Sequence, residues 1–161
     1  MSESYSNQLK LVSAEATELA GRRLAAAVLA TAPASLCIFL QGELGAGKTT
    51  LARGFLRGMG HAGRVPSPAD TLVEPYDCAD YRVAHLDLYR LQDGAELEYL
   101  GVDELTGPGS LLLIEWPERA LNSLPNRDLE ITLKVISEGR TLQIEACSPA
   151  GTALLARLDE F

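Results

Sequence analysis

The chain has 161 residues, about the length of one domain, and 47% of them are apolar, which excludes an intrinsically disordered protein. Its 22 acidic and 14 basic residues give a net charge of −8, and this acidic balance disfavours unaided binding to the phosphate backbone of a nucleic acid. One domain over residues 1–161, with enough apolar residues to bury a core, is therefore expected.

Neither export nor membrane insertion is expected from the sequence. The first ten residues lack the basic and apolar regions of a secretory signal. The most apolar stretch, residues 24–40, is shorter than the roughly 20 residues of a membrane span, and Pro33 interrupts it. Cys37, Cys78 and Cys147 show no C-x-x-C pairing, which argues against a disulfide framework and a zinc site. We expect a cytoplasmic protein with no membrane partner, whose cysteines are buried thiols.

The first third of the chain predicts a strand, a helix and a second strand. A short alternating strand is expected around residues 8–12, and Ser13 then provides the N-cap of a helix over residues 14–30. The apolar face of this helix comprises Leu19, Ala20, Leu24, Ala27 and Val28. Residues 36–40, LCIFL, are uninterrupted in their apolarity, as is typical of parallel strands buried on both faces. A glycine-rich loop and a helix over residues 49–57 follow.

The middle of the chain predicts a loop, a strand, a helix and another buried strand. An ordered loop over residues 65–75 leads into an extended segment. Residues 81–90 alternate as a strand, and one face of it carries Val83, His85, Asp87 and Tyr89. A helix is expected from its N-cap Asp93 to about residue 105, with Glu96 at the spacing of a capping box. The second continuous apolar strand covers residues 111–114.

The last third of the chain predicts a hairpin and a closing helix. Two alternating strands within residues 128–146 are joined at Glu138 and Gly139, and a short helix starts near Pro149. Buried strands that alternate with helices indicate an α/β fold. We expect a mixed, mainly parallel sheet, flanked by helices and extended by the C-terminal hairpin.

Residues 42–49 read GELGAGKT and fit the phosphate-loop pattern G-x-x-x-x-G-K-[ST]. The apolar strand before this segment and the helix after it would direct backbone N–H groups and a helix N-terminus at phosphate oxygens. Gly45 and Gly47 would let the backbone approach the anion closely. Lys48 would reach the β and γ phosphates, and the Thr49 hydroxyl would coordinate Mg²⁺. The α/β domain is therefore expected to be a P-loop NTPase.

Two acidic residues are candidates to complete the magnesium site. Asp87 lies within HLDLYR, and Glu115 follows the four apolar residues of the second buried strand. That position favours Glu115 as an acid at the strand end that opens onto the loop. A solvated position at the rim of the sheet is the ordinary alternative for either acid. His85 and Tyr89 share the strand face of Asp87 and are either packed core residues or part of the site.

Several motifs together resemble one family. They are GELGAGKTT with RGFLRGMG, VPSP with TLVEPYD, HLDLYRL, ELEYLGVDEL and IEWPER, in the family's order and approximate spacing over residues 11–158. The chain thereby resembles the bacterial TsaE (also called YjeE) ATPases of tRNA threonylcarbamoyladenosine biosynthesis. The resemblance implies a small P-loop ATPase that works with two partner proteins, of the TsaB and TsaD type. These partners transfer threonylcarbamoyl to adenosine 37 of tRNAs that read ANN codons. ATP turnover would activate or reset that complex, and the protein would meet tRNA only through it.

The resemblance also implies roles for individual residues, with ATP and Mg²⁺ as the cofactors. Lys48 and Thr49 would hold phosphate and Mg²⁺, Asp87 would take a second Mg²⁺ role, and Glu115 would position or activate the attacking water. Trp116 would lie near the nucleotide, unless it is only a core or rim aromatic residue. The expected nucleotide-binding residues are Glu43, Leu44, Gly45, Ala46, Gly47, Lys48, Thr49, Thr50 and Trp116. The expected catalytic residues are Lys48, Asp87 and Glu115, and the expected metal ligands are Thr49, Asp87 and Glu115.

The chain departs from the family in the loop after the phosphate-loop helix. The family usually has S-P-T-[FY]-T there, whereas this chain has Ser67, Pro68, Ala69, Asp70 and Thr71. A carboxylate near the γ-phosphate would repel it unless the side chain faced the metal or solvent. We therefore expect reduced intrinsic hydrolysis with ATP binding retained.

Two other functions stay open at this point. An ATP-gated binding module would use the nucleotide to order the loop over residues 65–76, with little hydrolysis, and the changes at Ala69 and Asp70 favour it. A small-metabolite kinase would pair the same phosphate loop with an acceptor pocket, but its arginine-rich lid is not found in the sequence. The choice of adenine over guanine rests on the family resemblance, since no N-K-x-D motif occurs.

Overall fold

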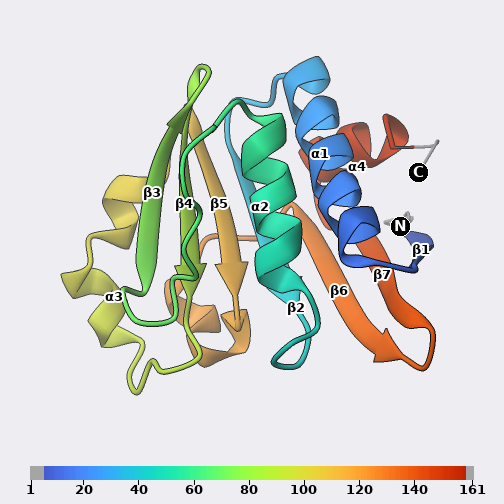
Figure 1. Cartoon of the computed structure of the whole chain (residues 1–161). Helices are drawn as coiled ribbons and strands as arrows, with labels where there is room; N and C mark the ends of the chain where they lie inside the picture. The colour runs from blue at the N-terminus through green and yellow to red at the C-terminus, as the bar shows by residue number, and fades with distance from the viewer. Residues whose placement is uncertain (1–5, 159–161) are drawn as a thin grey trace.

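The computed structural model describes residues 6–158, and its centre is a seven-stranded sheet with the strand order β1-β7-β6-β2-β5-β4-β3 (Figure 1). The strands are β1 Ser6–Leu11, β2 Leu36–Gln41, β3 Val73–Cys78, β4 Tyr81–Asp87, β5 Ser110–Glu115, β6 Leu129–Ile136 and β7 Gly139–Ala146. The α-helices are α1 Ala14–Thr31, α2 Lys48–Gly58, α3 Ala95–Tyr99 and α4 Pro149–Ala156. Three 3₁₀ helices, η1 Val102–Leu105, η2 Pro117–Arg119 and η3 Leu121–Ser123, lie in the loops around β5.

The four central strands run parallel to one another. Strand β2 pairs in parallel with both β5 and β6, and β4 pairs in parallel with β5. The antiparallel partners, β3 on one side and β7 with β1 on the other, occupy the edges. The predicted mixed sheet with flanking helices and a C-terminal hairpin is confirmed. Because parallel strands point the same way, the carboxyl ends of β2, β4 and β5 meet at one end of the sheet.

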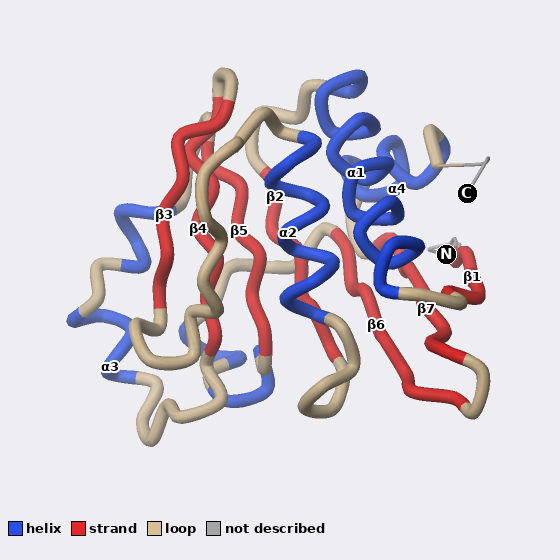
Figure 2. Tube along the Cα trace, viewed as in Figure 1, coloured by secondary structure: helices blue, strands red, loops and turns tan. Residues whose placement is uncertain are grey.

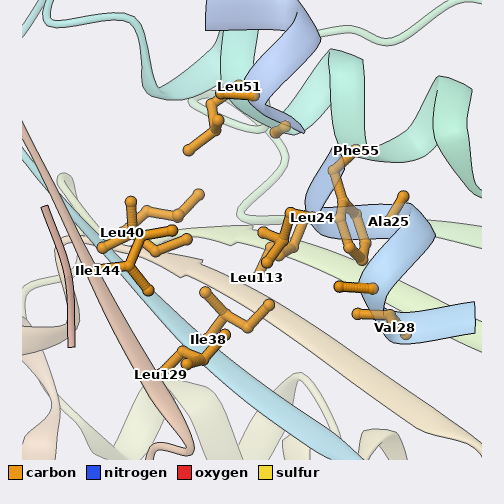
Figure 3. Close-up of a cluster of buried hydrophobic side chains, with 14 of the residues drawn as sticks. Leu24, Ala25, Val28, Ile38, Leu40, Leu51, Phe55, Leu113, Leu129 and Ile144 are labelled. Atoms are coloured by element: carbon orange, nitrogen blue, oxygen red, sulfur yellow. The ribbon is translucent and has the colours of Figure 1, made fainter. Parts of the chain in front are cut away.

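Alternation along the central strands divides the core between the two faces of the sheet. In β2, Ile38 and Leu40 face the cluster that packs under α1, α2 and α4, whereas Cys37 and Phe39 face a second cluster that includes Leu97 of α3. Figure 3 shows part of the first cluster, where side chains from α1 and α2 meet those of the sheet. Burying one such leucine contributes about 1.5–3 kcal/mol, so both faces stabilise the strands that carry the candidate site.

Helices α1 and α2 pack closely because both have glycine at their crossing. A Cβ atom on Gly54 would overlap the backbone of Glu18, and one on Gly21 would overlap the backbone of α2 at Leu51. Helix α1 begins at the predicted N-cap Ser13, whose Oγ accepts a hydrogen bond from the N–H of Ala16 at 3.1 Å. The close packing of α1 against α2 fixes the position of α2, which starts directly after the glycine-rich loop.

Two predictions about the helices are wrong in part. Leu19 is 49% exposed, because the close contact with α2 turns Gly21 and Ala25 of α1 inward in its place. The single helix expected from residue 93 to about 105 is two short pieces, α3 and η1, separated by Gly101 at φ 70°. Gly94 is the N-cap of α3, whereas the Asp93 carboxylate accepts the N–H of Ala95 in a local turn.

Three smaller predictions also need correction. Strand β4 ends at Asp87, since the Asp87 carboxylate accepts the N–H of Tyr89 and starts a turn. The hairpin turns at residues 137 and 138, and Gly139 already pairs with Ile136 as the first residue of β7. Cys147 is exposed, although Cys37 and Cys78 are buried as expected, and all three are free thiols. Across residues 6–158, no helix is both long and apolar enough to cross a membrane.

Candidate nucleotide-binding site

The glycine-rich loop connects β2 to α2 at the end of the sheet where the parallel strands finish (Figures 1 and 2). Gly47 has φ 108°, a left-handed conformation that favours glycine, and it is the N-cap of α2. The first hydrogen bond within the helix runs from the N–H of Leu51 to the carbonyl of Gly47 at 2.9 Å. The N–H groups of Lys48, Thr49 and Thr50 come before it and have no partner within the helix. The loop therefore presents backbone donors and the positive end of a helix dipole together.

Lys48 is buried at the start of α2, with only 5% of its surface exposed. Its Nζ donates to the carbonyl oxygen of Gly42 at 2.6 Å, lies 3.9 Å from Glu115 Oε1, and sits 4.0 Å from the centre of the Trp116 ring. Burial lowers the pKa of Lys48, and the charges of Glu115 and Asp87 only partly offset that effect. A buried ammonium with incomplete ion pairing favours the entry of an anion.

Two carboxylates face Lys48 from neighbouring strands. Asp87 ends β4 and Glu115 ends β5, and the two residues are paired in the parallel register. Glu115 continues the alternation of Leu111 and Leu113, so its side chain points to the sheet face that carries α2. Burial raises the pKa of Asp87, and the charge of Glu115 raises it further. The hydrogen bond from the backbone N–H of Tyr89 and the charges of Lys48 and His85 act in the opposite direction. The site thus holds buried charge of both signs.

His85 supports Glu115 from within the sheet. Its Nε2 lies 2.6 Å from Glu115 Oε2, and the ring is fully buried. With the carboxylate ionised, Nε2–H donates to it, and the other ring nitrogen, Nδ1, finds no hydrogen-bond partner among the described residues. The sequence left His85 open between a core residue and a site residue, and the structure places it against a site carboxylate.

Lys48, Asp87 and Glu115 line a cavity of about 280 Å³, whereas His85 lies behind Glu115 and is not part of its wall. The residues around it are Leu44, Gly45, Gly47, Lys48, Thr49, Thr50, Ser67, Ala69, Asp87, Glu115 and Trp116. Most of the predicted site residues are therefore together, but Glu43 and Ala46 are not among the lining residues. The Ala46 side chain is in the core, and its N–H is occupied by the carbonyl of Glu43 at 3.0 Å.

The residues of this cavity fit a magnesium–phosphate complex better than a metal cage. Within the described part of the chain, no group of three or more histidine, cysteine, aspartate or glutamate side chains gathers to hold a metal ion. Mg²⁺ is commonly held by one or two carboxylates together with substrate phosphates and water. The Thr49 hydroxyl with Asp87 and Glu115, beside backbone donors for phosphate, is such a set.

A second cavity of about 210 Å³ adjoins the first across the loop. The two cavities share Gly45, Gly47 and Thr50. The remaining lining residues come from the end of β1, the start of α1 and the hairpin: Leu11, Val12, Ser13, Ala14, Thr17, Gly139 and Arg140. A ligand longer than a phosphate chain could extend from one cavity into the other.

Comparison with known proteins places this geometry in one family. Residues 11–142 match the family described as threonylcarbamoyl adenosine biosynthesis protein TsaE. The chain belongs to the TsaE family.

Individual relatives agree with this assignment. The chain is 40% identical over 122 residues to the tRNA threonylcarbamoyladenosine biosynthesis protein TsaE of Haemophilus influenzae, which covers 76% of this chain and 77% of that protein. It is 40% identical over 116 residues to the Synechocystis TsaE, with 70% of each chain covered. Its fold is similar to a crystal structure of Bacillus subtilis YdiB, with a TM-score of 0.80, 28% identity, and coverage of 98% of this chain and 97% of that one.

The TsaE-family loop that departs from the usual pattern runs beside α2 toward the site (Figure 2). Ala69 lines the first cavity, whereas the Asp70 side chain is 85% exposed and pairs with Arg90 at 3.0 Å. Of the two orientations considered for Asp70, the structure has the outward one. Because the Asp70 carboxylate faces solvent and pairs with Arg90, its charge is screened and adds little repulsion inside the cavity.

Arg140 is a residue that the sequence gave no reason to single out in a TsaE-type site. It donates hydrogen bonds to the carbonyl oxygens of Gly45 and Ala46 in the phosphate loop, which lie 95 and 94 positions earlier in the chain, respectively. No local motif or periodicity marks this contact. Trp116, by contrast, was expected near the nucleotide and has its ring over Lys48, held there with a left-handed backbone at φ 57°.

Proposed function

We propose that the protein is the ATPase of tRNA threonylcarbamoyladenosine biosynthesis, hydrolysing ATP to ADP and phosphate to activate or reset the threonylcarbamoyl-transfer complex. One observation carries this proposal. Lys48 and Thr49 at the start of α2 and the acids that end β4 and β5 line the same cavity. Charge stabilisation on both sides of a transferred phosphoryl group requires such an arrangement.

Each residue has a defined task in this proposal. The N–H groups of Gly45, Gly47 and residues 48–50 bind phosphate oxygens, and the Lys48 ammonium leaves the Gly42 carbonyl for the β and γ phosphates. Glu115 accepts a hydrogen bond from the attacking water and thereby orients it, and it can take up the proton that the water loses. His85 keeps one Glu115 oxygen occupied, so the other faces the cavity.

The Thr49 hydroxyl and the Asp87 carboxylate would hold Mg²⁺, with Glu115 close enough to share the role. The ion would supply neutralisation of the phosphate charge when it is bound. Asp87 is suited to this task because its burial makes an uncompensated negative charge costly, and a cation removes that cost. Trp116 covers Lys48 and restricts water at this side of the cavity.

The nucleoside part of ATP would occupy the second cavity. A phosphate chain on Gly45, Gly47 and Thr50 leads directly into it, because these residues line both cavities. The wall formed by Val12 and Thr17 adds apolar surface beside the loop. Family membership favours adenine as the base.

The partners in this proposal are proteins of the TsaB and TsaD type, which would hold the tRNA. The net charge of −8 supports an indirect contact with tRNA, since the acidic chain would be repelled by the phosphate backbone. An ATP-gated module with little hydrolysis is the second candidate. The observation that favours it is the ion pair between Asp70 and Arg90, which connects the loop beside the cavity to the segment after β4. The small-metabolite kinase receives no comparable support.

The test is steady-state phosphate release from ATP by the protein alone, with its two partners, and with Lys48→Ala as the control. The proposal expects release that the partners stimulate and that Lys48→Ala abolishes. ATP binding without release above the control, with partners present, would establish the gated module in its place. A phosphorylated small molecule in the presence of a metabolite mixture would identify a kinase.

A further inference from the structure

The phosphate loop is held from outside by a side chain of the C-terminal hairpin. Arg140 Nε donates to the carbonyl of Ala46 at 3.2 Å, and Nη2 donates to the carbonyl of Gly45 at 3.3 Å. A third nitrogen, Nη1, donates to the carbonyl of Gly139 at 3.0 Å. One guanidinium therefore spans two successive peptides of the loop and anchors them to β7.

The peptide geometry connects this contact to anion binding. A peptide unit is planar, so fixing the carbonyl oxygen of Ala46 also fixes the direction of the N–H of Gly47 in the same unit. That N–H belongs to the group of donors that face a bound phosphate in the proposed function. The Ala46 side chain lies in the core and the Gly47 carbonyl accepts the N–H of Leu51, whereas Gly45 is exposed and a Cβ atom there would meet nothing within 4 Å. Arg140 adds to these contacts the hydrogen bonds on the Gly45 and Ala46 carbonyl oxygens, which fix the tilt of the two peptide planes.

The hairpin is built to bring Arg140 to the loop. Gly139 has φ 131°, and a Cβ atom at this position would overlap the carbonyl oxygen of Leu11. Glycine therefore allows the start of β7 to close against the end of β1, where Leu11 pairs with Arg140. The same approach places Arg140 at the wall of the second cavity.

We propose that Arg140 is a positioning residue that holds the phosphate loop in its anion-binding conformation through the carbonyl oxygens of Gly45 and Ala46. This inference rests on the proposed function, because it assumes that the loop binds the phosphates of ATP. A direct contact between Arg140 and the nucleoside is a different role. The two roles make opposite predictions for a ligand that has phosphates and no nucleoside.

The experiment measures the affinity of Mg²⁺-ATP and of Mg²⁺-tripolyphosphate by calorimetry for the wild type, Arg140→Ala and Arg140→Lys. Lys10→Ala is the matched control. Lys10 also connects the hairpin to β1, through an exposed ion pair with Glu138 at 2.6 Å, but within residues 6–158 it forms no hydrogen bond or ion pair with the phosphate loop. Thermal unfolding of each variant, with and without the ligand, accompanies the titrations.

The positioning role predicts that Arg140→Ala weakens both ligands by a similar factor of about ten, since two charge-assisted hydrogen bonds are lost. Arg140→Lys should retain part of the affinity for both ligands, because a lysine ammonium reproduces only some of the hydrogen bonds that the guanidinium makes to the two carbonyl oxygens. Lys10→Ala should leave both affinities unchanged. If Arg140→Ala fails to fold, Arg140→Lys carries the same comparison with a smaller loss.

Three results would overturn the inference. Weakened ATP binding with unchanged tripolyphosphate binding would make Arg140 a nucleoside contact. A lower unfolding temperature with both affinities intact would make its role purely structural, and no change at all would leave it without a role. If the wild type binds neither ligand, the proposed function itself fails, which is a separate outcome from failure in the Arg140 variants alone.

Discussion

The two ends of the central parallel strands use carboxylates in different ways. Where β2 and β6 begin, Asp128 accepts the N–H of Cys37 at 2.8 Å and the hydroxyl of Ser148 at 2.7 Å. Ser148 in turn caps α4 by accepting the N–H of Gly151 at 3.0 Å. Where β4 and β5 end, Asp87 accepts the N–H of Tyr89 and Glu115 contacts the buried His85 ring, but both carboxylates also face a buried lysine whose ion pairing is incomplete.

This difference separates stability from function along a single sheet. Asp128 completes backbone hydrogen bonds that would otherwise be buried without partners, so it stabilises the fold without any ligand. Lys48, Asp87 and Glu115 carry charges whose burial is costly, and in the proposed function bound phosphate and Mg²⁺ would offset that cost. Ligands of α/β sheets generally bind at the carboxyl ends of the strands, and the concentration of buried charge at that end is in line with the proposed site.

Glu115→Gln should produce the largest effect at the carboxyl end. The amide keeps the shape of the side chain but cannot accept the proton of the attacking water, so kcat for ATP hydrolysis should fall by about 10²–10⁴-fold. ATP affinity should change much less, because the phosphate donors lie on the loop. The measurement is single-turnover phosphate release with partners present, and a variant that retains at least half of wild-type kcat would refute the role.

Asp128→Ala should produce the largest stability effect at the opposite end. The substitution removes the acceptor of the buried Cys37 N–H and of the Ser148 hydroxyl, which should cost about 2 kcal/mol of unfolding free energy. Urea unfolding followed by circular dichroism gives this value, and kcat should stay near wild type at a temperature where the variant is folded. A stable variant that loses hydrolysis would erase the distinction between the two ends.

Asp87→Asn should stabilise the protein in the absence of nucleotide and magnesium. Burial raises the pKa of Asp87, so the ionised carboxylate is less favourable in the folded chain than in the unfolded one, and this cost is present at pH values above that pKa. A neutral amide of the same shape should raise the unfolding free energy by about 1 kcal/mol while hydrolysis is lost, a trade of activity for stability. The same urea titration measures it, and a destabilised variant would mean that Asp87 is already compensated within the site.

The double substitution Ala69→Thr with Asp70→Phe should have the smallest effect, a rise in turnover of a few-fold. It restores the threonine usual in the family at position 69, which lines the first cavity, and the aromatic residue usual at position 70. The change at position 70 also removes the exposed ion pair between Asp70 and Arg90. The single substitution Asp70→Asn, which only weakens that pair, should leave turnover nearly unchanged. An unchanged rate in the double variant would show that the loop departure does not limit hydrolysis.

The sequence predicted the parts of the site that depend on local pattern. The phosphate loop, the strand before it and the acid that ends β5 all follow from short-range spacing and continuous apolarity. The contact between His85 and Glu115 depends on the parallel register of β4 and β5, which places Asp87 beside Glu115. The sequence of either strand alone does not contain this register. Arg140 is still less accessible to pattern analysis, because its contact with the loop requires the hairpin, β1 and the loop together.

A local backbone conformation and a contact between two helices explain the predictions that were wrong. Gly101 interrupts the helix expected after Asp93, and the sequence pattern around it is equally compatible with a continuous helix. Leu19 is exposed because two glycines bring α1 and α2 together and thereby select which face of α1 is buried. Neither outcome can be deduced from the periodicity of one helix considered by itself.

The most direct test of the central claim is a titration of the protein with Mg²⁺-ATP, followed by the fluorescence of Trp116. Trp116 is the single tryptophan of the chain, and its ring lies 4.0 Å from Lys48 Nζ at the cavity. Movement of Lys48 toward phosphate should change this contact, so we expect a saturable fluorescence change that is lost in Lys48→Ala. No fluorescence change, together with no heat of binding in calorimetry, would contradict the assignment of the charged strand ends as an ATP site.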